Sequence, residues 1–255
     1  KFGSVAIPLV IFCILGVLIL IKLLIKKVPI SSKMSYLIAI GTSVCGATAI
    51  VATAPVINAK KTEVAYAIAN ITFFGVIAML VYPYFAEWYF DNNALEAGLF
   101  LGTSIHETSQ VAAAGLIYDQ QFNNPETLDV ATVTKLIRNT FLVILIPLFA
   151  FLYNRGEFKG QKYSILNIFP YFVIGFIGMI ILRNLGDQFF SIESDNFYAW
   201  SKFIEYLKIL TTVFLTMAMA AVGISINLNE LKSMGYKPFV VGLIAAITVG
   251  IISLI

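Results

Sequence analysis

Long apolar segments constrain this chain more than any other feature. Six runs are each long enough to cross a bilayer, which takes about 20 mostly apolar residues. Charged residues are only 12% of the chain, whereas a soluble domain has roughly 25%. We therefore predict an all-α polytopic membrane protein. The six apolar runs cover residues 5–26, 64–85, 131–153, 164–185, 204–226 and 238–255.

Two further apolar segments, 34–58 and 94–118, are interrupted near their middle by glycine, threonine and serine. The first contains "GTSVCGATAIVATAP" from Gly41, and the second contains "GTSIHETSQVAAAG" from Gly102. A pair of Gly-interrupted hydrophobic segments in two halves of a chain indicates a transporter binding site. We expect about eight membrane segments, two of them Gly-interrupted, in an inverted-repeat transporter architecture.

The lysines predict how the interrupted segments enter the membrane. Loops rich in Lys and Arg face the cytoplasm, so segment 34–58 should enter and leave on one side as a re-entrant hairpin. The basic loop after 131–153 then requires 94–118 to re-enter from the opposite face. In the alternative, both segments cross as broken helices. The basic residues around the first segment are Lys22, Lys26, Lys27, Lys33, Lys60 and Lys61.

Broken helices inside a membrane could bind an anion. A break exposes up to four N–H groups at the new helix N-terminus, and the local dipole favours negative charge. Two such breaks would form a cage of neutral donors that suits a small oxyanion. In the alternative reading, the small residues only allow tight helix packing in lipid. The hydroxyl donors at the breaks are Thr42, Ser43, Thr48, Thr103, Ser104, Thr108 and Ser109.

His106 and Glu107 lie at the centre of the second interrupted segment. Ionisable side chains inside a membrane are costly and mark substrate or proton pathways, so we predict that this pair carries or gates a coupling proton. The alternative is a structural hydrogen bond that holds the break. A zinc-hydrolase motif would need histidine where the chain has Gln110, and we expect no metal, no cofactor and no enzymatic activity.

Lys135, Arg138 and Asn70 are further candidates within the apolar segments. Lys135 and Arg138 are one helical face apart near the start of a span, and we predict that they snorkel to the interface; attraction of anions is the alternative. Asn70 lies between the two breaks, where it either points at the site or bonds its neighbours.

Three stretches resemble the YeiH-like family of bacterial inner-membrane proteins, described as sulfate exporters. They are the two interrupted segments quoted above and "MAMAAVGISINLNELKSMGYKPFVVG" near the C-terminus. The resemblance covers the chain from its first span to its last. It implies kinship with a superfamily of cation–proton antiporters and anion transporters, whose discontinuous helices cross near the midplane. That kinship favours the broken-crossing alternative. Family members are longer at the N-terminus, so residues 1–255 are expected to be a single transporter domain lacking its first spans.

The resemblance also implies a location and a ligand. The location is the bacterial inner membrane, and the first candidate ligands are sulfate, sulfite or a related sulfonate. Both breaks are carried over as the substrate-binding site, with His106 and Glu107 as the coupling or gating pair. The carried-over binding residues are Gly41, Thr42, Ser43, Cys45, Gly46, Gly102, Thr103, Ser104 and Thr108.

We therefore predict a secondary transporter, in the export direction, that carries a small oxyanion by alternating access. The alternatives are an anion channel and a carrier for an unrelated small organic anion. Expected partners are the anion, the lipid bilayer, a coupling proton or sodium ion, and a second copy in a homodimer. The net charge of +3 is too small and too scattered to indicate a nucleic-acid partner.

Overall fold

The computed structural model describes residues 2–24, 27–157, 171–190, 197–224 and 235–254, and these residues form helices without a strand. The chain divides into two compact units, which are described separately. Unit 1 comprises Lys1–Gln161 and Leu228–Ile255, and unit 2 comprises Lys162–Asn227. The all-helical prediction is confirmed for the described residues.

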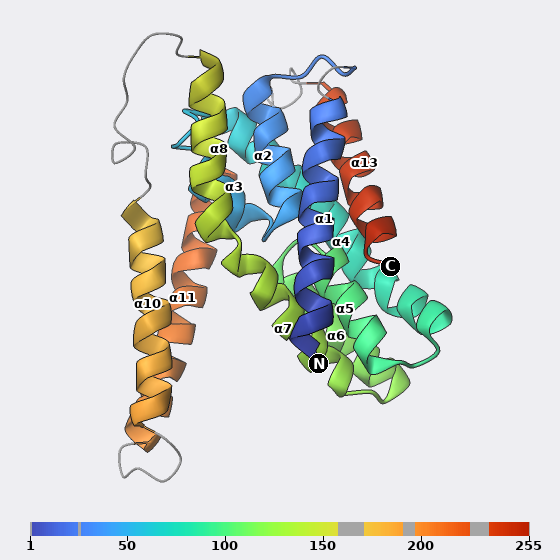
Figure 1. Ribbon diagram of the computed structural model, residues 1–255, viewed down its shortest axis with the longest axis vertical. Helices are drawn as coiled ribbons and strands as arrows, with labels where there is room; N and C mark the ends of the chain where they lie inside the picture. Colours follow the sequence, from blue (N-terminus) through green and yellow to red (C-terminus); the bar gives the residue numbers. More distant parts are fainter. Residues whose placement is uncertain (1, 25–26, 158–170, 191–196, 225–234, 255) are drawn as a thin grey trace. The chain divides into compact units, whose positions relative to one another are not determined.

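The helices of both units are labelled in Figure 1. In unit 2 they are α10 (Tyr171–Phe189) and α11 (Phe197–Ile224). In unit 1 they are α1 (Phe2–Leu24), α2 (Ser32–Ser43), α3 (Ala47–Thr53), α4 (Lys61–Phe90), α5 (Ala94–Ser104), α6 (Thr108–Phe122), α7 (Glu126–Thr140), α8 (Leu142–Glu157) and α13 (Lys237–Ile252).

Three described segments are long and apolar enough to cross a membrane: Phe2–Leu24, Lys61–Phe90 and Glu126–Phe149. The third differs from the prediction, because the run 131–153 is not one helix. It begins earlier, in α7, and turns at Phe141 before α8. Pro147 inside α8 lacks an N–H and weakens the helix just beyond that turn. The predicted run 164–185 lies partly outside the described residues.

The first interrupted segment folds into a helical hairpin, which we call the first hairpin (α2 and α3, residues 32–53). Its two ends lie together, because the Ser31 hydroxyl donates to Glu63 Oε1 at 2.5 Å and Lys33 Nζ donates to the Asn58 carbonyl at 2.7 Å. The Ser31 side chain also caps α2 by accepting from the Met34 N–H. The segment therefore returns to the end at which it started.

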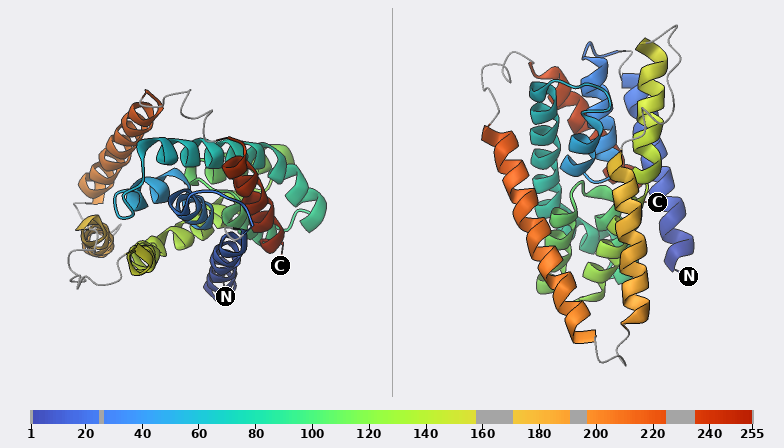
Figure 2. Two further views of the ribbon diagram at one scale, coloured as in Figure 1. Left: turned by 90° about the horizontal axis from the view of Figure 1, so that it is seen from above. Right: turned by 90° about the vertical axis from the view of Figure 1, so that its left-hand side faces the viewer.

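The second interrupted segment forms the second hairpin (α5 and α6, residues 94–122). Asn124 Nδ2 donates to the Asn92 carbonyl and to Asn92 Oδ1 at 3.0 and 2.8 Å, which closes the open end. The first hairpin ends where α4 begins, and the second starts where α4 ends, so the two enter from opposite ends of that helix. Figures 1 and 2 show them one above the other along α4. These contacts favour the re-entrant alternative over broken crossings.

The outward faces of unit 1 suit lipid. Large apolar side chains are exposed along α1 and α4, among them Phe12, Ile19 and Leu80. Near the C-terminal end of α4, Trp88 is 78% exposed and Tyr89 is also exposed, as is typical of aromatic side chains at the membrane–water interface. The same helix begins at Lys61, so α4 carries a basic end and an aromatic end.

Unit 2 contains a polar cluster near the end of α10. Arg183 Nε donates to Asp187 Oδ2 at 2.6 Å, and the Trp200 indole of α11 donates to Asp187 Oδ1 at 2.8 Å. A Cβ at Gly186 would lie 2.0 Å from the Trp200 ring. A small residue is therefore needed where the two helices approach.

Candidate functional site

The breaks of the two hairpins meet. A Cβ on Gly46 of the first break would lie 2.6 Å from Cγ of Glu107 in the second. Gly46 adopts φ +67°, a conformation that glycine tolerates better than other residues. We call the two breaks, residues 41–46 and 102–108, together with Lys135 and Arg138 of α7, the junction.

Lys135 joins the two breaks from α7. Its side chain is fully buried, and Nζ donates to the carbonyls of Val44, Ile105 and His106 at 2.9, 2.8 and 2.5 Å. Three acceptors match the three protons of an ammonium, whereas a neutral amine has only two. The geometry therefore fits the charged form of the side chain.

Arg138 lies one turn further along α7 and is also fully buried. Its Nε donates to the Ser43 carbonyl at 2.7 Å, and Nη1 donates to the Thr103 carbonyl at 2.6 Å. Nη1 also donates to the Ile105 carbonyl at 3.4 Å, and Nη2 donates to the Thr42 carbonyl. The last carbonyls of a helix lack intrahelical partners and carry partial negative charge. Arg138 therefore caps α2 and α5 at once.

The prediction that Lys135 and Arg138 snorkel is wrong. Neither cation has a carboxylate within ion-pair distance; among the described residues the ion pair found is Arg183–Asp187. Burial of an unpaired charge costs several kcal/mol unless hydrogen bonds and opposite charge compensate it. Here the backbone of both breaks supplies the hydrogen bonds, and two formal positive charges remain at the junction.

Glu107 is the acidic group of the junction. Its side chain is half-buried, and Oε1 accepts from the Thr72 hydroxyl of α4 at 2.9 Å. Glu107 is also the N-cap residue of α6 and makes no side-chain cap. The first N–H groups of α6 therefore have no partner from the cap, and negative charge is favourable beside them.

His106 is buried, and its Nδ1 has no hydrogen-bond partner among the described residues. No hydrogen bond joins it to Glu107 in the part of the chain that the structure describes. The two residues face different surroundings: the His106 carbonyl binds Lys135, whereas the Glu107 side chain contacts Thr72 and Gly46. They are neighbours in sequence rather than a bonded pair.

The glycines of the two Gly-Thr-Ser steps lie inside helices. α2 ends at Ser43 and α5 ends at Ser104, so the chain leaves the helix after each step and not at its glycine. A Cβ at Gly41 would lie 2.1 Å from Ile71, and one at Gly102 would lie 2.6 Å from the Ala131 carbonyl. These two glycines serve close helix packing, and Gly46 is the glycine that shapes a break.

The hydroxyls of the second break are partly occupied. Thr103 donates to the Leu99 carbonyl at 2.7 Å and Ser104 donates to the Phe100 carbonyl at 2.6 Å, so both protons stay within α5. Thr108 Oγ1 accepts from Asn139 Nδ2 at 3.2 Å, which leaves its proton free to donate.

In the first break, a buried hydroxyl is left without a hydrogen bond to the described residues. Ser43 Oγ is buried and has no hydrogen-bond partner within the described part of the chain, and Thr42 is buried too. Cys45 is a buried free thiol. Among the described hydroxyls of the two breaks, Ser43 and Thr108 can offer a proton to an anion, beside the first N–H groups of α6, which Glu107 does not cap.

Two residues that the sequence did not single out belong to this region. Thr72 holds Glu107, and Gln110 Nε2 donates to the Thr72 carbonyl at 3.3 Å. Asn70, for which two roles were open, donates to the Pro238 carbonyl of α13 at 2.9 Å. It bonds a neighbouring helix instead of the junction.

Thr72 also gives the depth of the junction. At a rise of about 1.5 Å per residue, it lies roughly 17 Å from the Lys61 end of α4 and roughly 27 Å from the Phe90 end. A hydrocarbon core is about 30 Å thick, so α4 is long enough to cross it with both ends beyond its surfaces. The junction lies beside the middle part of α4, away from its basic and aromatic ends.

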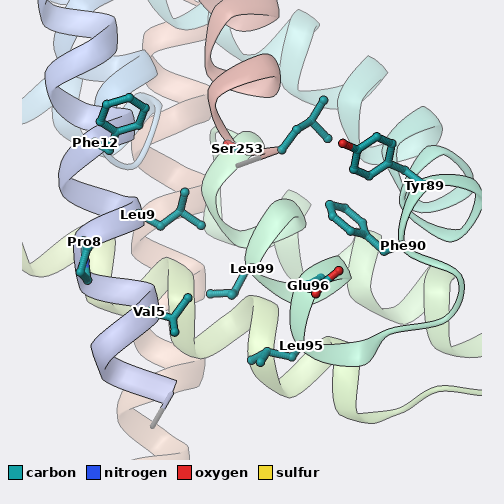
Figure 3. Close-up of a pocket in the computed structure, with 11 residues that line it drawn as sticks. Val5, Pro8, Leu9, Phe12, Tyr89, Phe90, Leu95, Glu96, Leu99 and Ser253 are labelled. Atoms are coloured by element: carbon teal, nitrogen blue, oxygen red, sulfur yellow. The ribbon is translucent and has the colours of Figure 1, made fainter.

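A separate cavity of about 810 Å³ opens at the other end of α4 (Figure 3). Apolar side chains dominate its wall, and Glu96 is its acidic residue. An apolar wall with a carboxylate does not suit an anion, so we do not assign it to the junction's chemistry. The cavity is lined by Val5, Pro8, Leu9, Phe12, Tyr89, Phe90, Leu95, Glu96, Leu99, Ser253 and Leu254.

Comparison with known proteins shows the family of this chain. The model of the family described as "Conserved hypothetical protein 698" matches residues 1–242. A UPF0324 membrane protein of Fusobacterium nucleatum is 34% identical over 258 residues, which covers 99% of this chain and 74% of the relative. A UPF0324 membrane protein of Streptococcus agalactiae is 34% identical over 252 residues, covering 99% and 72%.

A third relative, a UPF0324 membrane protein of Streptococcus pneumoniae, is 34% identical over 252 residues, covering 97% of this chain and 70% of the relative. No solved structure matches the chain. These matches are consistent with the YeiH-like resemblance. The chain therefore belongs to the conserved hypothetical protein 698 family, whose relatives are UPF0324 membrane proteins.

Proposed function

We propose that this protein is a secondary transporter, working in the export direction, for a small oxyanion such as sulfate or sulfite. The observation that carries the proposal is the pair of buried cations, Lys135 and Arg138. They have no carboxylate partner among the described residues and lie where two helix breaks meet. Positive charge inside a membrane is costly. An anion that binds there lowers that cost.

The cations act through their charge more than through direct contact. Their protons already go to backbone carbonyls, so an anion takes its hydrogen bonds from other groups. Ser43, Thr108 and the first N–H groups of α6 can supply them: Ser43 Oγ has no partner among the described residues, Thr108 Oγ1 accepts from Asn139, and Glu107 does not cap α6. Neutral donors beside buried positive charge suit a small, fully dehydrated oxyanion.

Two hairpins that enter from opposite ends of α4 support alternating access. Inverted repeats with discontinuous helices place the binding site near the bilayer midplane in many transporters. We propose the same relation between α2–α3 and α5–α6 here, in a multi-pass protein of the bacterial inner membrane. His106 and Glu107 are proposed to couple transport to protons. Sodium coupling and a homodimer stay predictions.

An anion channel is the second candidate, because the same buried cations would also attract anions to a pore. The discriminating property is counter-flow: a carrier saturates and is stimulated by anion on the opposite side, whereas a channel is not.

The test is uptake of labelled sulfate and sulfite into proteoliposomes that contain the full-length protein, with and without an imposed pH gradient. We expect saturable uptake with stimulation from the opposite side. Uptake of neither anion by folded protein would contradict the proposed substrates. Uptake without saturation would favour the channel.

A further inference from the structure

Counting the charges of the junction leads beyond the proposed function, on which this inference rests. Lys135 and Arg138 contribute two positive charges, and Glu107 contributes one negative charge. The partial charges of the helix ends offset one another, because each break joins the C-terminus of one helix to the N-terminus of the next. The junction therefore holds one uncompensated positive charge.

The surroundings of Glu107 make it the group that can change the net charge of the junction. It contacts Gly46 of the first break and the neutral Thr72 hydroxyl of α4. The titratable or charged groups that interact with it are Cys45 from the first break and Lys135 from α7. Arg138 acts on Lys135 in turn, and His106 is the neighbour in sequence.

The hydrogen bonds of Lys135 and Arg138 suit their charged forms. All three Lys135 protons are engaged with carbonyls, and an arginine stays protonated. Glu107 is half-buried and has one oxygen free of hydrogen bonds from the described side chains. Glu107 is therefore the charged group of the junction that has an oxygen left to take a proton.

We propose that the junction binds one net negative charge, so that a divalent oxyanion enters together with one proton on Glu107 and a monovalent oxyanion enters alone. A dianion beside an ionised Glu107 would leave one negative charge unpaired in the apolar layer, which is costly. The proton comes from water, bonds to a carboxylate oxygen of Glu107 and returns to water when the anion leaves. No covalent bond of the substrate changes.

The experiment measures anion uptake and proton movement together in proteoliposomes of the full-length protein. Sulfate serves as the divalent probe and nitrate as the monovalent probe. We expect about one proton to move with each sulfate and none with nitrate. In Glu107→Gln, sulfate uptake should lose its proton movement, because the positive charges alone then balance the dianion.

One variant serves as the control. Glu96→Gln changes an exposed carboxylate outside the junction and should keep about one proton per sulfate. His106→Gln is measured beside Glu107→Gln to show which of the two side chains carries the proton. Each variant is compared with the original chain by size-exclusion chromatography and thermal melting, so that a misfolded variant is recognised.

The outcomes separate the two proposals. Sulfate uptake without protons in the original chain, or unchanged proton movement in Glu107→Gln, would overturn the charge-balance inference and leave the transporter standing. Proton movement lost in His106→Gln and kept in Glu107→Gln would also overturn it. Absence of uptake for both probes in folded protein would overturn the transporter itself.

Discussion

The two hairpins share a plan but differ in chemistry. Both leave the helix after Gly-Thr-Ser, and both present their terminal carbonyls to the same cations of α7. The first break is shaped by Gly46, at φ +67°, and contains no Asp, Glu, His, Lys or Arg. The second contains His106 and Glu107 and continues into the longer α6. One hairpin supplies backbone shape and the other supplies titratable groups.

The comparison shows that two side chains of α7 hold both breaks, which allows the breaks to carry different side chains. Lys135 and Arg138 satisfy carbonyls from both breaks, so neither hairpin needs its own donor for them. The side chains of each break are then free to differ. The predictions that follow separate what the hairpins share from what distinguishes them, beginning with the largest expected effect.

Arg138→Met tests the shared support. It removes the donors to carbonyls of both hairpins, and each buried unsatisfied group costs about 1–3 kcal/mol. We expect a loss of about 4 kcal/mol or more and little folded protein, measured by thermal melting on size-exclusion chromatography in detergent. Arg138→Lys should lose less, because it keeps the charge. Arg183→Met in unit 2 changes an exposed side chain and is the control; its melting temperature should stay close to that of the original chain. If the melting temperature of Arg138→Met also stayed close to it, Arg138 would not support both hairpins.

Gly46→Ala tests the shape of the first break. Its φ is unfavourable for alanine, and the new Cβ would meet Cγ of Glu107 at 2.6 Å. We expect a loss of about 3 kcal/mol by thermal melting. The matched control is Gly235→Ala, also at positive φ (+71°) but with nothing within 4 Å of the added Cβ. It should cost about 1 kcal/mol. Equal losses would mean that the contact between the hairpins adds nothing.

Thr72→Val tests what distinguishes the second hairpin. The change keeps the shape of the side chain but removes the hydrogen bond to Glu107 Oε1. We expect a loss of about 1 kcal/mol in stability and a shift in the pH dependence of anion uptake. Thr140→Val is the control, because the hydroxyl of the exposed Thr140 donates to the Ile137 carbonyl of its own helix. A pH profile identical to that of the original chain would contradict the role of Thr72.

Lys33→Ala and Asn124→Ala compare the closed ends of the two hairpins. Each removes an exposed hydrogen bond that ties the two legs of its hairpin together. Both losses should be small, about 0.5 kcal/mol, and should appear as faster hydrogen exchange at the ends of the hairpins. Faster exchange at the breaks as well would show that the ends and the junction are coupled.

The sequence predicted the hairpins better than it predicted the junction. Hydropathy marked the interrupted segments, and the positions of the lysines favoured re-entry, which agrees with the contacts of Ser31 and Lys33 at one end and Asn124 at the other. These features depend on local composition. The resemblance, by contrast, favoured broken crossings, which the contacts do not support.

Lys135 and Arg138 were misjudged for a physical reason. Cations near the start of an apolar run usually reach the interface, and the partners that keep these two inside are backbone carbonyls, which every residue has. A signal was nevertheless present. Two broken helices must find donors for their last carbonyls, and a Lys and an Arg on one helical face of an apolar run could have been read as those donors.

The hydrogen bonds from α7 to both breaks also limit how this protein can move. Rotating one hairpin against the other would break several buried contacts of Lys135 and Arg138 at once. In the proposed transport cycle the hairpins and α7 would therefore move as one rigid body. Opening the junction to each side in turn would displace that whole body against its surroundings, and the two hairpins would not open independently.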